Sequence, residues 1–322
     1  MKGHLAEPTR AIGVFHVALT VARRYWSANR ISGWWRTAQD SKTQLDSCAP
    51  RLKVSTAVGD NEVIERIDAF CDAVPRRRAR ADEHGPLSEA RAARIVARLA
   101  ASRPRTVLDI GCGWGELMLR ILAAVPEAAG LGLDTGEGDL ARGRASAQAR
   151  GLGDRAAFVR ESAVGTARGP ADLVLCVGSS HALTEVEPPA HREAALAELR
   201  RLVNPGGRVL LGEGFWHRTP AEAELARMWP GTTAGEFGDL AGLADLAVAA
   251  GFRPAWIETA TLGEWEDFES GYQCDEEEWL AAHGDHPKAA ELRERVEQHR
   301  SYWLRGYYGL LGQAYLTLVP VG

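Results

Sequence analysis

From Leu87 onward, short apolar runs alternate with segments whose apolar residues recur at helical spacing. The apolar runs cover Thr106–Ile110, Gly130–Asp134, Ala157–Val159, Asp172–Val177 and Arg208–Leu211. Between them, the spacing predicts helices over Glu116–Ala124, Leu140–Arg150 and Arg192–Val203. Strands that alternate with helices are typical of βαβ units, so we expect a doubly wound α/β fold with a mostly parallel sheet.

The C-terminal part departs from this alternation. A helix is predicted over Leu240–Ala250 and a strand over Gly251–Glu258, whereas the last strand, Gly312–Val319, comes only after a long intervening segment. We therefore expect one domain over residues 81–322, in which residues 259–309 form an inserted cap.

This inserted segment is strongly acidic and aromatic. Residues 261–280 contain eight Asp or Glu and no Lys or Arg, and among them lie Trp265, Phe268, Tyr272 and Trp279. One interpretation is a lid whose aromatics and carboxylates enclose a cationic substrate. The other is an amphipathic helical cap with its aromatics inward. We favour the lid, and we expect its acids to be solvated charges.

Residues 1–80 differ from the rest in charge. They contain 14 Lys or Arg and 8 Asp or Glu, a net charge of +6, whereas the other 242 residues contain 24 and 35, a net charge of -11. We predict a helical N-terminal extension that packs on the domain or on a partner subunit, as in a homodimer; an amphipathic surface helix is the alternative. Its apolar run over 11–22 is shorter than the roughly 20 residues of a membrane span, so we expect neither a signal peptide nor stable membrane insertion.

Composition narrows the class of protein. The 322 residues are 45% hydrophobic and 25% charged, which is ordinary for a globular chain. Five scattered cysteines without CxxC spacing argue against a disulfide framework and a zinc ribbon, and they predict a cytoplasmic protein. The acidic body disfavours nucleic acid as a partner and favours a small neutral or cationic substrate. His283 and His286 lack a third ligand at useful spacing, so we expect no metal site.

The most informative stretch joins the first predicted strand to the helix that follows it. Asp109 is followed by Gly111, Gly113 and Gly115, and the helix begins at once. Glycine permits a positive φ, and it lets a ligand approach the backbone at a helix N-terminus. At the end of the next strand, Asp134 is placed to accept hydrogen bonds from the hydroxyls of a ribose.

Two classes of ligand use this geometry. Dinucleotide-binding loops have the spacing GxGxxG and hold a pyrophosphate over the helix N-terminus. This chain has GxGxG, with Glu116 where it would repel a phosphate. A carboxylate is harmless beside a cationic sulfonium, so the loop favours a sulfonium cofactor.

With Asp109 before the loop and Asp134 after it, the chain resembles the class I S-adenosylmethionine-dependent methyltransferases over roughly residues 87–258 and the last strand. The stretch Asn204-Pro205-Gly206-Gly207 is similar to the turn before the fifth strand of that family. The resemblance implies a Rossmann-like sheet of seven strands with the last one antiparallel, and S-adenosylmethionine as the cofactor.

The same resemblance implies roles for individual residues. The three loop glycines would lie under the methionine part of the cofactor, and Asp109 would anchor that loop or reach the amino group. Asp134 would hold the ribose hydroxyls. After the third strand, where the family often has an acidic residue facing adenine, this chain has Ser162, with Glu161 beside it.

Two residues are candidates for the chemistry. Methyl transfer needs a positioned acceptor, and it needs a general base only when the acceptor carries a proton of high pKa. His181 follows the fourth predicted strand and Glu213 follows the fifth, at the strand ends that form the ligand crevice of doubly wound sheets. His181 is the first candidate base, with helix capping or a cofactor contact as its alternative role. Glu213 would orient the substrate or act as a base with a raised pKa.

Three functions fit these features. The leading one is methylation of a small molecule, a metabolite or natural product, on oxygen, nitrogen or carbon. The second is methylation of a protein or nucleic acid, although Val177–Ser180 lacks the Asn/Asp-Pro-Pro-aromatic motif of amino-methyltransferases that act on bases. The third is a non-catalytic, cofactor-binding regulatory module.

Overall fold

The computed structural model describes residues 85–322. The extension predicted over residues 1–80 therefore lies outside the described residues. The described chain divides into a sheet unit, Ala93–Thr259 with Ser301–Gly322, and an insertion unit, Ala260–Arg300 with residues 85–92. Among the helices of residues 85–322, none is long and apolar enough to cross a membrane.

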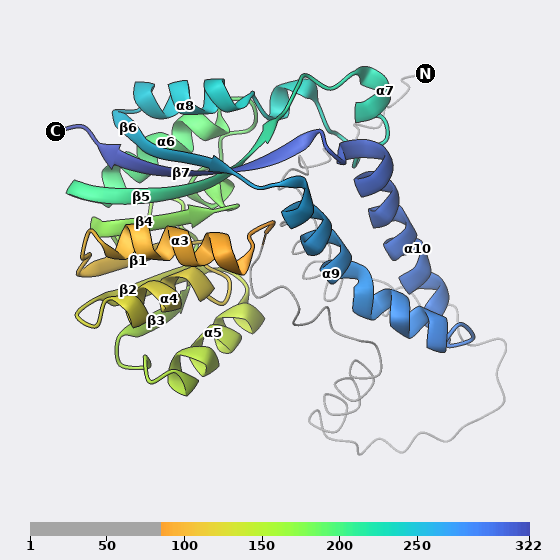
Figure 1. Ribbon diagram of the computed structural model, residues 1–322, viewed down its shortest axis with the longest axis horizontal. Helices are drawn as coiled ribbons and strands as arrows, with labels where there is room; N and C mark the ends of the chain where they lie inside the picture. The colour runs from red at the N-terminus through yellow and green to blue at the C-terminus, as the bar shows by residue number, and fades with distance from the viewer. Residues whose placement is uncertain (1–84) are drawn as a thin grey trace, which may run out of the picture. The chain divides into compact units, whose positions relative to one another are not determined.

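The sheet has seven strands in the order β3-β2-β1-β4-β5-β7-β6 (Figure 1). In chain order the strands are β1 (Thr106–Ile110), β2 (Ala129–Asp134), β3 (Ala156–Arg160), β4 (Ala171–Val177), β5 (Val203–Trp216), β6 (Phe252–Thr259) and β7 (Leu311–Pro320). The first five are parallel, whereas β7 lies between β5 and β6 and is antiparallel to both. This confirms the predicted α/β fold with an antiparallel last strand.

Helices cover both faces of this sheet. The helical elements of the sheet unit are α3 (Glu89–Ala100, which begins in the insertion unit), α4 (Glu116–Ala124), α5 (Glu137–Ala149), η2 (Ser180–Leu183), α6 (His191–Leu202), α7 (Glu222–Leu225), η3 (Ala234–Glu236), α8 (Leu240–Ala249) and η4 (Tyr302–Tyr307). Leucines of α6 and α8 pack with Ile110, Val174 and Leu211 in one buried cluster. On the opposite face, Met118 of α4 lies so close to Gly130 that a side chain there would collide with it. Apolar strand residues that point to opposite faces of the sheet therefore pack against a layer of helices on each side.

One predicted strand is longer than its apolar run. The run Arg208–Leu211 predicts a short strand, but β5 extends to Trp216, and every residue of β5 from Val209 to Trp216 has a partner on β7. The pattern missed this because Gly212, Glu213 and Gly214 interrupt the apolar run. The antiparallel ladder with β7 carries the strand through them, and this places Glu213 inside the sheet.

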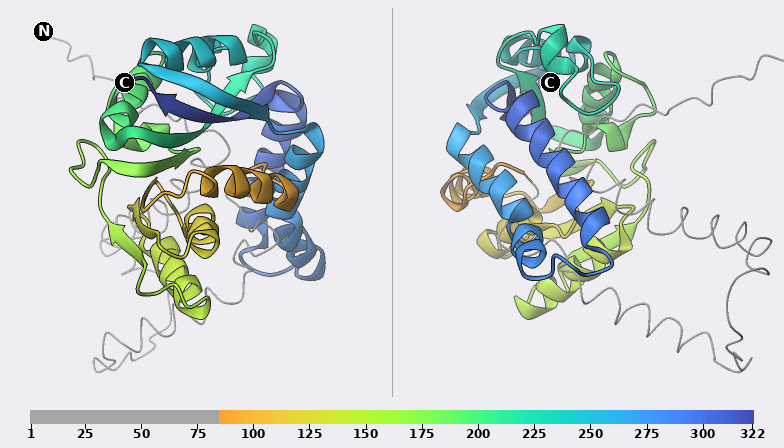
Figure 2. Two further views of the ribbon diagram at one scale, coloured as in Figure 1. Left: turned by 60° about the vertical axis from the view of Figure 1, so that its left-hand side comes forward. Right: turned by 90° about the vertical axis from the view of Figure 1, so that its right-hand side faces the viewer.

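The insertion unit consists of two antiparallel helices, α9 (Leu262–Ala282) and α10 (Ala289–Ser301), which lie side by side (Figure 2). Helix α9 begins at a capping box: Thr261 Oγ1 accepts from the Glu264 amide at 3.2 Å, and Glu264 Oε2 accepts from the Thr261 amide at 2.8 Å. The acidic, aromatic stretch of the sequence is thus one continuous helix.

Candidate active site

The glycine loop follows β1 and has the backbone that its glycines permit. Gly111, Gly113 and Gly115 all have left-handed φ values, of 60°, 59° and 68°. A Cβ on Gly111 would lie 2.5 Å from Ser179 Cβ, and one on Gly115 would lie 2.7 Å from Phe158 Cε1. Both conformation and packing therefore require glycine in this loop.

Asp134, at the end of β2, holds this loop. Its Oδ2 accepts from the Gly113 amide at 2.8 Å, and its Oδ1 accepts from the Gly136 amide at 2.8 Å. The carboxylate is buried. A carboxylate oxygen can accept more than one hydrogen bond, so these two backbone bonds do not exclude hydroxyl groups as further donors.

The loop after β4 closes the other side of the glycine loop. Ser179 Oγ donates to the carbonyl of Ile110 at 2.6 Å, which ties the end of β1 to this loop. Cys176 Sγ lies 3.5 Å from the same hydroxyl, and burial raises the pKa of Cys176 to about 12, so it remains a thiol inside the core. Sequence reasoning had not singled out Ser179, although Val177-Gly178-Ser179-Ser180 has the small residues that such a close approach requires.

Glu213 is buried in β5, one residue beyond the last pair that β5 forms with β4. Its Oε1 accepts from the Gly214 amide at 3.2 Å, whereas Oε2 is buried without a hydrogen-bond partner. Burial raises the pKa of Glu213, while hydrogen bonding from Ser180, the charge of Arg192 and the Gly214 amide each pull it down. The site thus contains a carboxyl group that holds a proton more readily than usual.

The other predicted residues occupy the same edge of the sheet. Asp109 is buried near the end of β1. His181 is half-buried in η2, directly after the Ser180 that bonds to Glu213. Ser162 is exposed, and its hydroxyl accepts from the Val164 amide at 3.3 Å, while the neighbouring Glu161 pairs with Arg168 at 2.7 Å.

Glu116, at the start of α4, is engaged within the fold. It accepts from Arg150 at 2.7 Å and from Arg120 at 2.8 Å. Burial alone would raise the pKa of this carboxyl, but the hydrogen bonds and charges of the two arginines hold it below the ordinary value. The charge that the sequence places beside the loop is therefore already neutralised by two partners.

The sequence analysis missed two further buried residues, Arg192 and Glu236, of which Arg192 interacts through its charge with both Glu213 and Glu236. Arg192, at the N-terminus of α6, and Glu236, in η3, are 5% and 3% exposed. Arg192 Nε and Nη1 and Glu236 Oε1 are buried without hydrogen-bond partners. The three charged side chains belong to α6, β5 and η3, so no local sequence pattern joins them.

The acids of α9 correct one expectation. We expected them to be solvated, but Glu264, Glu269 and Glu276 are buried. Glu264 forms an ion pair with Arg91 at 2.7 Å and Glu276 forms one with Arg295 at 2.8 Å, while Glu269 lies 2.8 Å from the His299 ring nitrogen. The expectation was wrong for these three because the basic partners lie far from them in sequence, two of them on α10.

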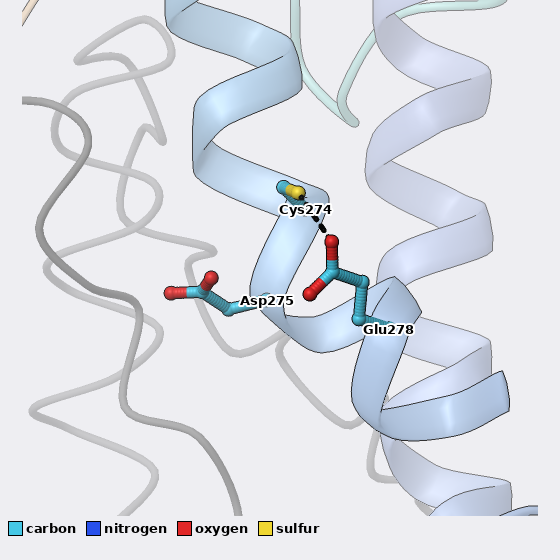
Figure 3. Close-up of side chains that lie close together, drawn as sticks. All are labelled: Cys274, Asp275 and Glu278. Atoms are coloured by element: carbon cyan, nitrogen blue, oxygen red, sulfur yellow. Dashed lines mark hydrogen bonds between the residues drawn. The ribbon is translucent and has the colours of Figure 1, made fainter. Parts of the chain in front are cut away.

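Titratable groups of the insertion unit also come together at two other places. His283 stacks on Trp279 with ring centroids 4.8 Å apart, and His286 meets the same ring edge-on at 5.0 Å. Ligand atoms of Cys274, Asp275 and Glu278 lie within 4.8 Å of one another, and the Cys274 thiol donates to Glu278 (Figure 3). These three belong to one turn of α9 and are only partly covered by protein, an arrangement common without an ion, so we assign no metal to it.

Comparison with known proteins connects the loop to a family. Residues 107–207, which include the glycine loop and Asp134, match the family described as Methyltransferase domain. The protein named Uncharacterized protein YjhP of Escherichia coli (strain K12) is 29% identical over 212 residues, which cover 65% of this chain and 82% of that protein. The X-ray structure of YjhP superposes with a TM-score of 0.64 and 24% identity, covering 74% of this chain and 96% of that chain.

Two more proteins share parts of the chain. A SAM-dependent methyltransferase from Geobacter sulfurreducens, crystallised with S-adenosyl-L-homocysteine, superposes with a TM-score of 0.65 at 23% identity and covers 79% of this chain and 98% of that one. The Trans-aconitate 2-methyltransferase of Methylobacterium nodulans (strain LMG 21967 / CNCM I-2342 / ORS 2060) is 35% identical over 116 residues, covering 36% of this chain and 41% of that protein. The fold of this chain is therefore shared with the two solved structures.

Proposed function

Because this chain is an S-adenosylmethionine-dependent methyltransferase of the class I fold, we propose that it methylates a small organic molecule. The observation that carries the proposal is Glu213, a buried carboxyl with an unpaired Oε2 at the strand ends beside the glycine loop. Because this carboxyl is buried, it suits an acceptor that is small enough to reach the strand ends. The name of the related trans-aconitate 2-methyltransferase supports the same class of acceptor.

The cofactor residues take the following roles in this proposal. The left-handed glycines bring the backbone of the loop close to the methionine part of the cofactor, and Asp109 anchors that loop or reaches the amino group. Asp134, already fixed by the Gly113 and Gly136 amides, accepts from the ribose hydroxyls. Ser162, which follows β3, is assigned to the adenine side in this proposal.

When bound, S-adenosylmethionine supplies an electrophilic methyl group on a positively charged sulfur. The lone pair of the acceptor atom forms the bond to the methyl carbon while the carbon–sulfur bond breaks, and the electron pair of that bond remains on sulfur. If the acceptor atom carries a proton, that proton moves to a general base. The residues of this chain therefore have to orient the acceptor, exclude water and hold the proton.

Glu213 and His181 are the two groups proposed for the proton. Glu213 is placed by β5, and its raised pKa makes its carboxylate a stronger base than an ordinary one. His181 is placed by η2, beside the serine that bonds to Glu213. The two residues thus come from adjacent segments at one edge of the sheet.

The proposal is tested by incubating the full-length protein and S-adenosylmethionine with a small-molecule extract from which macromolecules have been removed. Mass spectrometry should reveal a product 14 Da heavier than a compound of the extract, formed by the wild type and strongly reduced with Asp134→Ala. A product found only when protein or nucleic acid is retained would contradict the small-molecule assignment.

The remaining predictions belong to this proposal as well. They are the cap role of residues 259–309, a homodimer contact through residues 1–80 and a cytoplasmic location. Each rests on sequence patterns described above, and each is separate from the acceptor assignment.

A further inference from the structure

A buried group of three ionisable side chains lies at the proposed acceptor site. Arg192 stands in the first turn of α6, Glu213 near the end of β5 and Glu236 at the end of η3. The segment after η3 returns to β5, because the Trp216 amide donates to the Gly238 carbonyl at 2.9 Å. A Cβ added to Gly238 would lie 3.6 Å from Arg192 Nη2, so this segment also passes the guanidinium.

These side chains are buried but do not satisfy one another. The exposed fractions are 5% for Arg192, 8% for Glu213 and 3% for Glu236. Arg192 Nε and Nη1, Glu213 Oε2 and Glu236 Oε1 are all buried without a hydrogen-bond partner. A buried polar atom without a partner is costly, and a group of four such atoms on three elements is unusual in a native protein. The arrangement indicates a polar group that comes from outside the chain.

The group is also continuous with the cofactor loop. Ser180 bonds to Glu213, the neighbouring Ser179 donates to the Ile110 carbonyl, and Gly111 packs against Ser179. Three consecutive contacts therefore connect the start of the glycine loop to Glu213 and onward to the charge of Arg192. An acceptor bound at Arg192 would lie along the same edge of the sheet as the cofactor.

We propose that Arg192 and Glu236 bind a carboxylate group of the methyl acceptor, with the guanidinium as the main donor and the Glu236 carboxyl as a second one. This inference rests on the proposed function and adds the chemical class of the acceptor. A guanidinium is the side chain best matched to a planar carboxylate, because its N–H groups form a fixed fork.

The protonation of the surrounding groups supports this assignment. Burial raises the pKa of Glu236 to about 9, although the Thr233 amide and the Arg192 charge lower it, so this carboxyl carries a proton that it can donate at neutral pH. Burial and the Arg192 charge lower the pKa of His191 to about 4, so His191 stays neutral. Glu193, on the same turn, is exposed to solvent. The unpaired nitrogens of Arg192 are donors and the protonated Glu236 carboxyl offers one more O–H, so an anionic group of the acceptor satisfies them.

The acidic character of the whole body predicted a neutral or cationic substrate. That expectation came from the net charge of residues 81–322, which is mostly surface charge, whereas a substrate contacts the buried groups at the site. A cationic group beside Arg192 would meet like charge in a poorly solvated place, which is unfavourable. We therefore replace the expectation with an acidic acceptor.

Three probes of one shape and different charge test the inference: benzoate, benzamide and benzylamine. Each is titrated by calorimetry into full-length protein saturated with S-adenosyl-L-homocysteine. The wild type should bind benzoate at least about tenfold more tightly than either of the others, and Arg192→Gln should lose at least about tenfold of the benzoate affinity. Arg192→Lys retains the positive charge without the forked N–H groups of the guanidinium, so it should bind benzoate more tightly than Arg192→Gln but less tightly than the wild type.

Arg200→Gln on the same helix is the matched control and should leave benzoate binding unchanged. All variants should bind S-adenosyl-L-homocysteine like the wild type, which separates a lost contact from a lost fold. Equal affinity for benzoate and benzylamine in the wild type, which requires no variant, would overturn the inference, and so would unchanged benzoate binding by Arg192→Gln. Either result would leave a 14 Da product in the extract assay standing, so the two proposals fail separately.

Discussion

The two halves of the carboxyl edge of the sheet differ in how their polar groups are satisfied. On the β1–β2 side, Asp134 accepts from two backbone amides, and across the loop Ser179 donates to the Ile110 carbonyl. On the β5–α6 side, Glu213, Arg192 and Glu236 all retain buried atoms without partners. The polar side chains on the β1–β2 side are hydrogen-bonded to the protein's own backbone, whereas those on the β5–α6 side keep buried atoms without hydrogen bonds.

In the proposed function, this difference corresponds to the two ligands of a methyl transfer. A cofactor common to many related proteins can be met by a loop whose geometry is fixed before binding, and fixed geometry lowers the entropy lost on binding. An acceptor specific to one enzyme has to be recognised by side chains, and these remain unsatisfied until it binds. The following predictions separate the two halves, from the largest expected effect to the smallest.

The largest effect is expected at the glycine loop. Gly111→Ala places a side chain at φ 60° with its Cβ 2.5 Å from Ser179 Cβ, so the free energy of unfolding should fall by about 3 kcal/mol. Gly151→Ala is the matched control, because Gly151 also has a left-handed φ of 68° but open space around it, and it should lose only about 1 kcal/mol. Urea unfolding measures both, and equal losses would contradict the packing argument.

The next effect is expected at Glu213. Glu213→Gln removes the proton acceptor but retains the size of the side chain, so kcat for methyl transfer should fall by about 100-fold with cofactor affinity unchanged. Steady-state kinetics on the acceptor found in the extract would measure this. If His181→Gln lowers kcat to that extent and Glu213→Gln does not, then His181 is the base and Glu213 has another role.

Asp134 should show a smaller effect that is confined to the cofactor. Asp134→Ala leaves the Gly113 and Gly136 amides without their acceptor and removes the partner of the ribose, so affinity for S-adenosyl-L-homocysteine should fall at least about tenfold. Asp134→Asn retains one oxygen, so its affinity for S-adenosyl-L-homocysteine should lie between those of the wild type and Asp134→Ala. Calorimetry measures all three proteins, with Asp154→Asn on the surface as the control, and unchanged affinity of Asp134→Ala would contradict the ribose assignment.

The last effect is a pH dependence of stability, at most about 1.4 kcal/mol for each pH unit. The pKa of Glu236 is about 9 in the folded protein and ordinary in the unfolded chain, so the folded state binds more protons between pH 5 and about 9. The free energy of unfolding should therefore fall as the pH rises through this range. Glu236→Gln cannot ionise, so the fall should be shallower than in the wild type, whereas the exposed control Glu222→Gln should leave the slope unchanged. Parallel slopes for Glu236→Gln and the wild type would contradict the burial argument.

The sequence predicted one half of the edge far better than the other. Strand β1, the glycine loop and helix α4 follow one another in the chain, so a local pattern contains all the information for their geometry. Arg192 and Glu236 meet only through the packing of α6 on β5 and the return of residues 234–238, and no spacing in the sequence encodes that meeting.

The insertion shows the same limit. The aromatics Trp265, Phe268 and Trp279 are buried, as in the amphipathic cap that the sequence offered only as the alternative to a lid. The sequence prediction placed Glu269 and Glu276 in solvent because their partners on α10 are about twenty to thirty residues away in the chain. Charge within one helix could be read from the sequence, but pairing between two helices could not.

The most direct test of the central claim is the pair of KM values in methyl-transfer kinetics on the acceptor identified in the extract, measured for the wild type, Asp134→Ala and Arg192→Gln. Asp134→Ala should raise the KM for S-adenosylmethionine and leave that of the acceptor within about threefold of the wild type, whereas Arg192→Gln should do the reverse. If both substitutions raise the same KM, the two halves of the edge do not serve two different ligands, and the account is wrong.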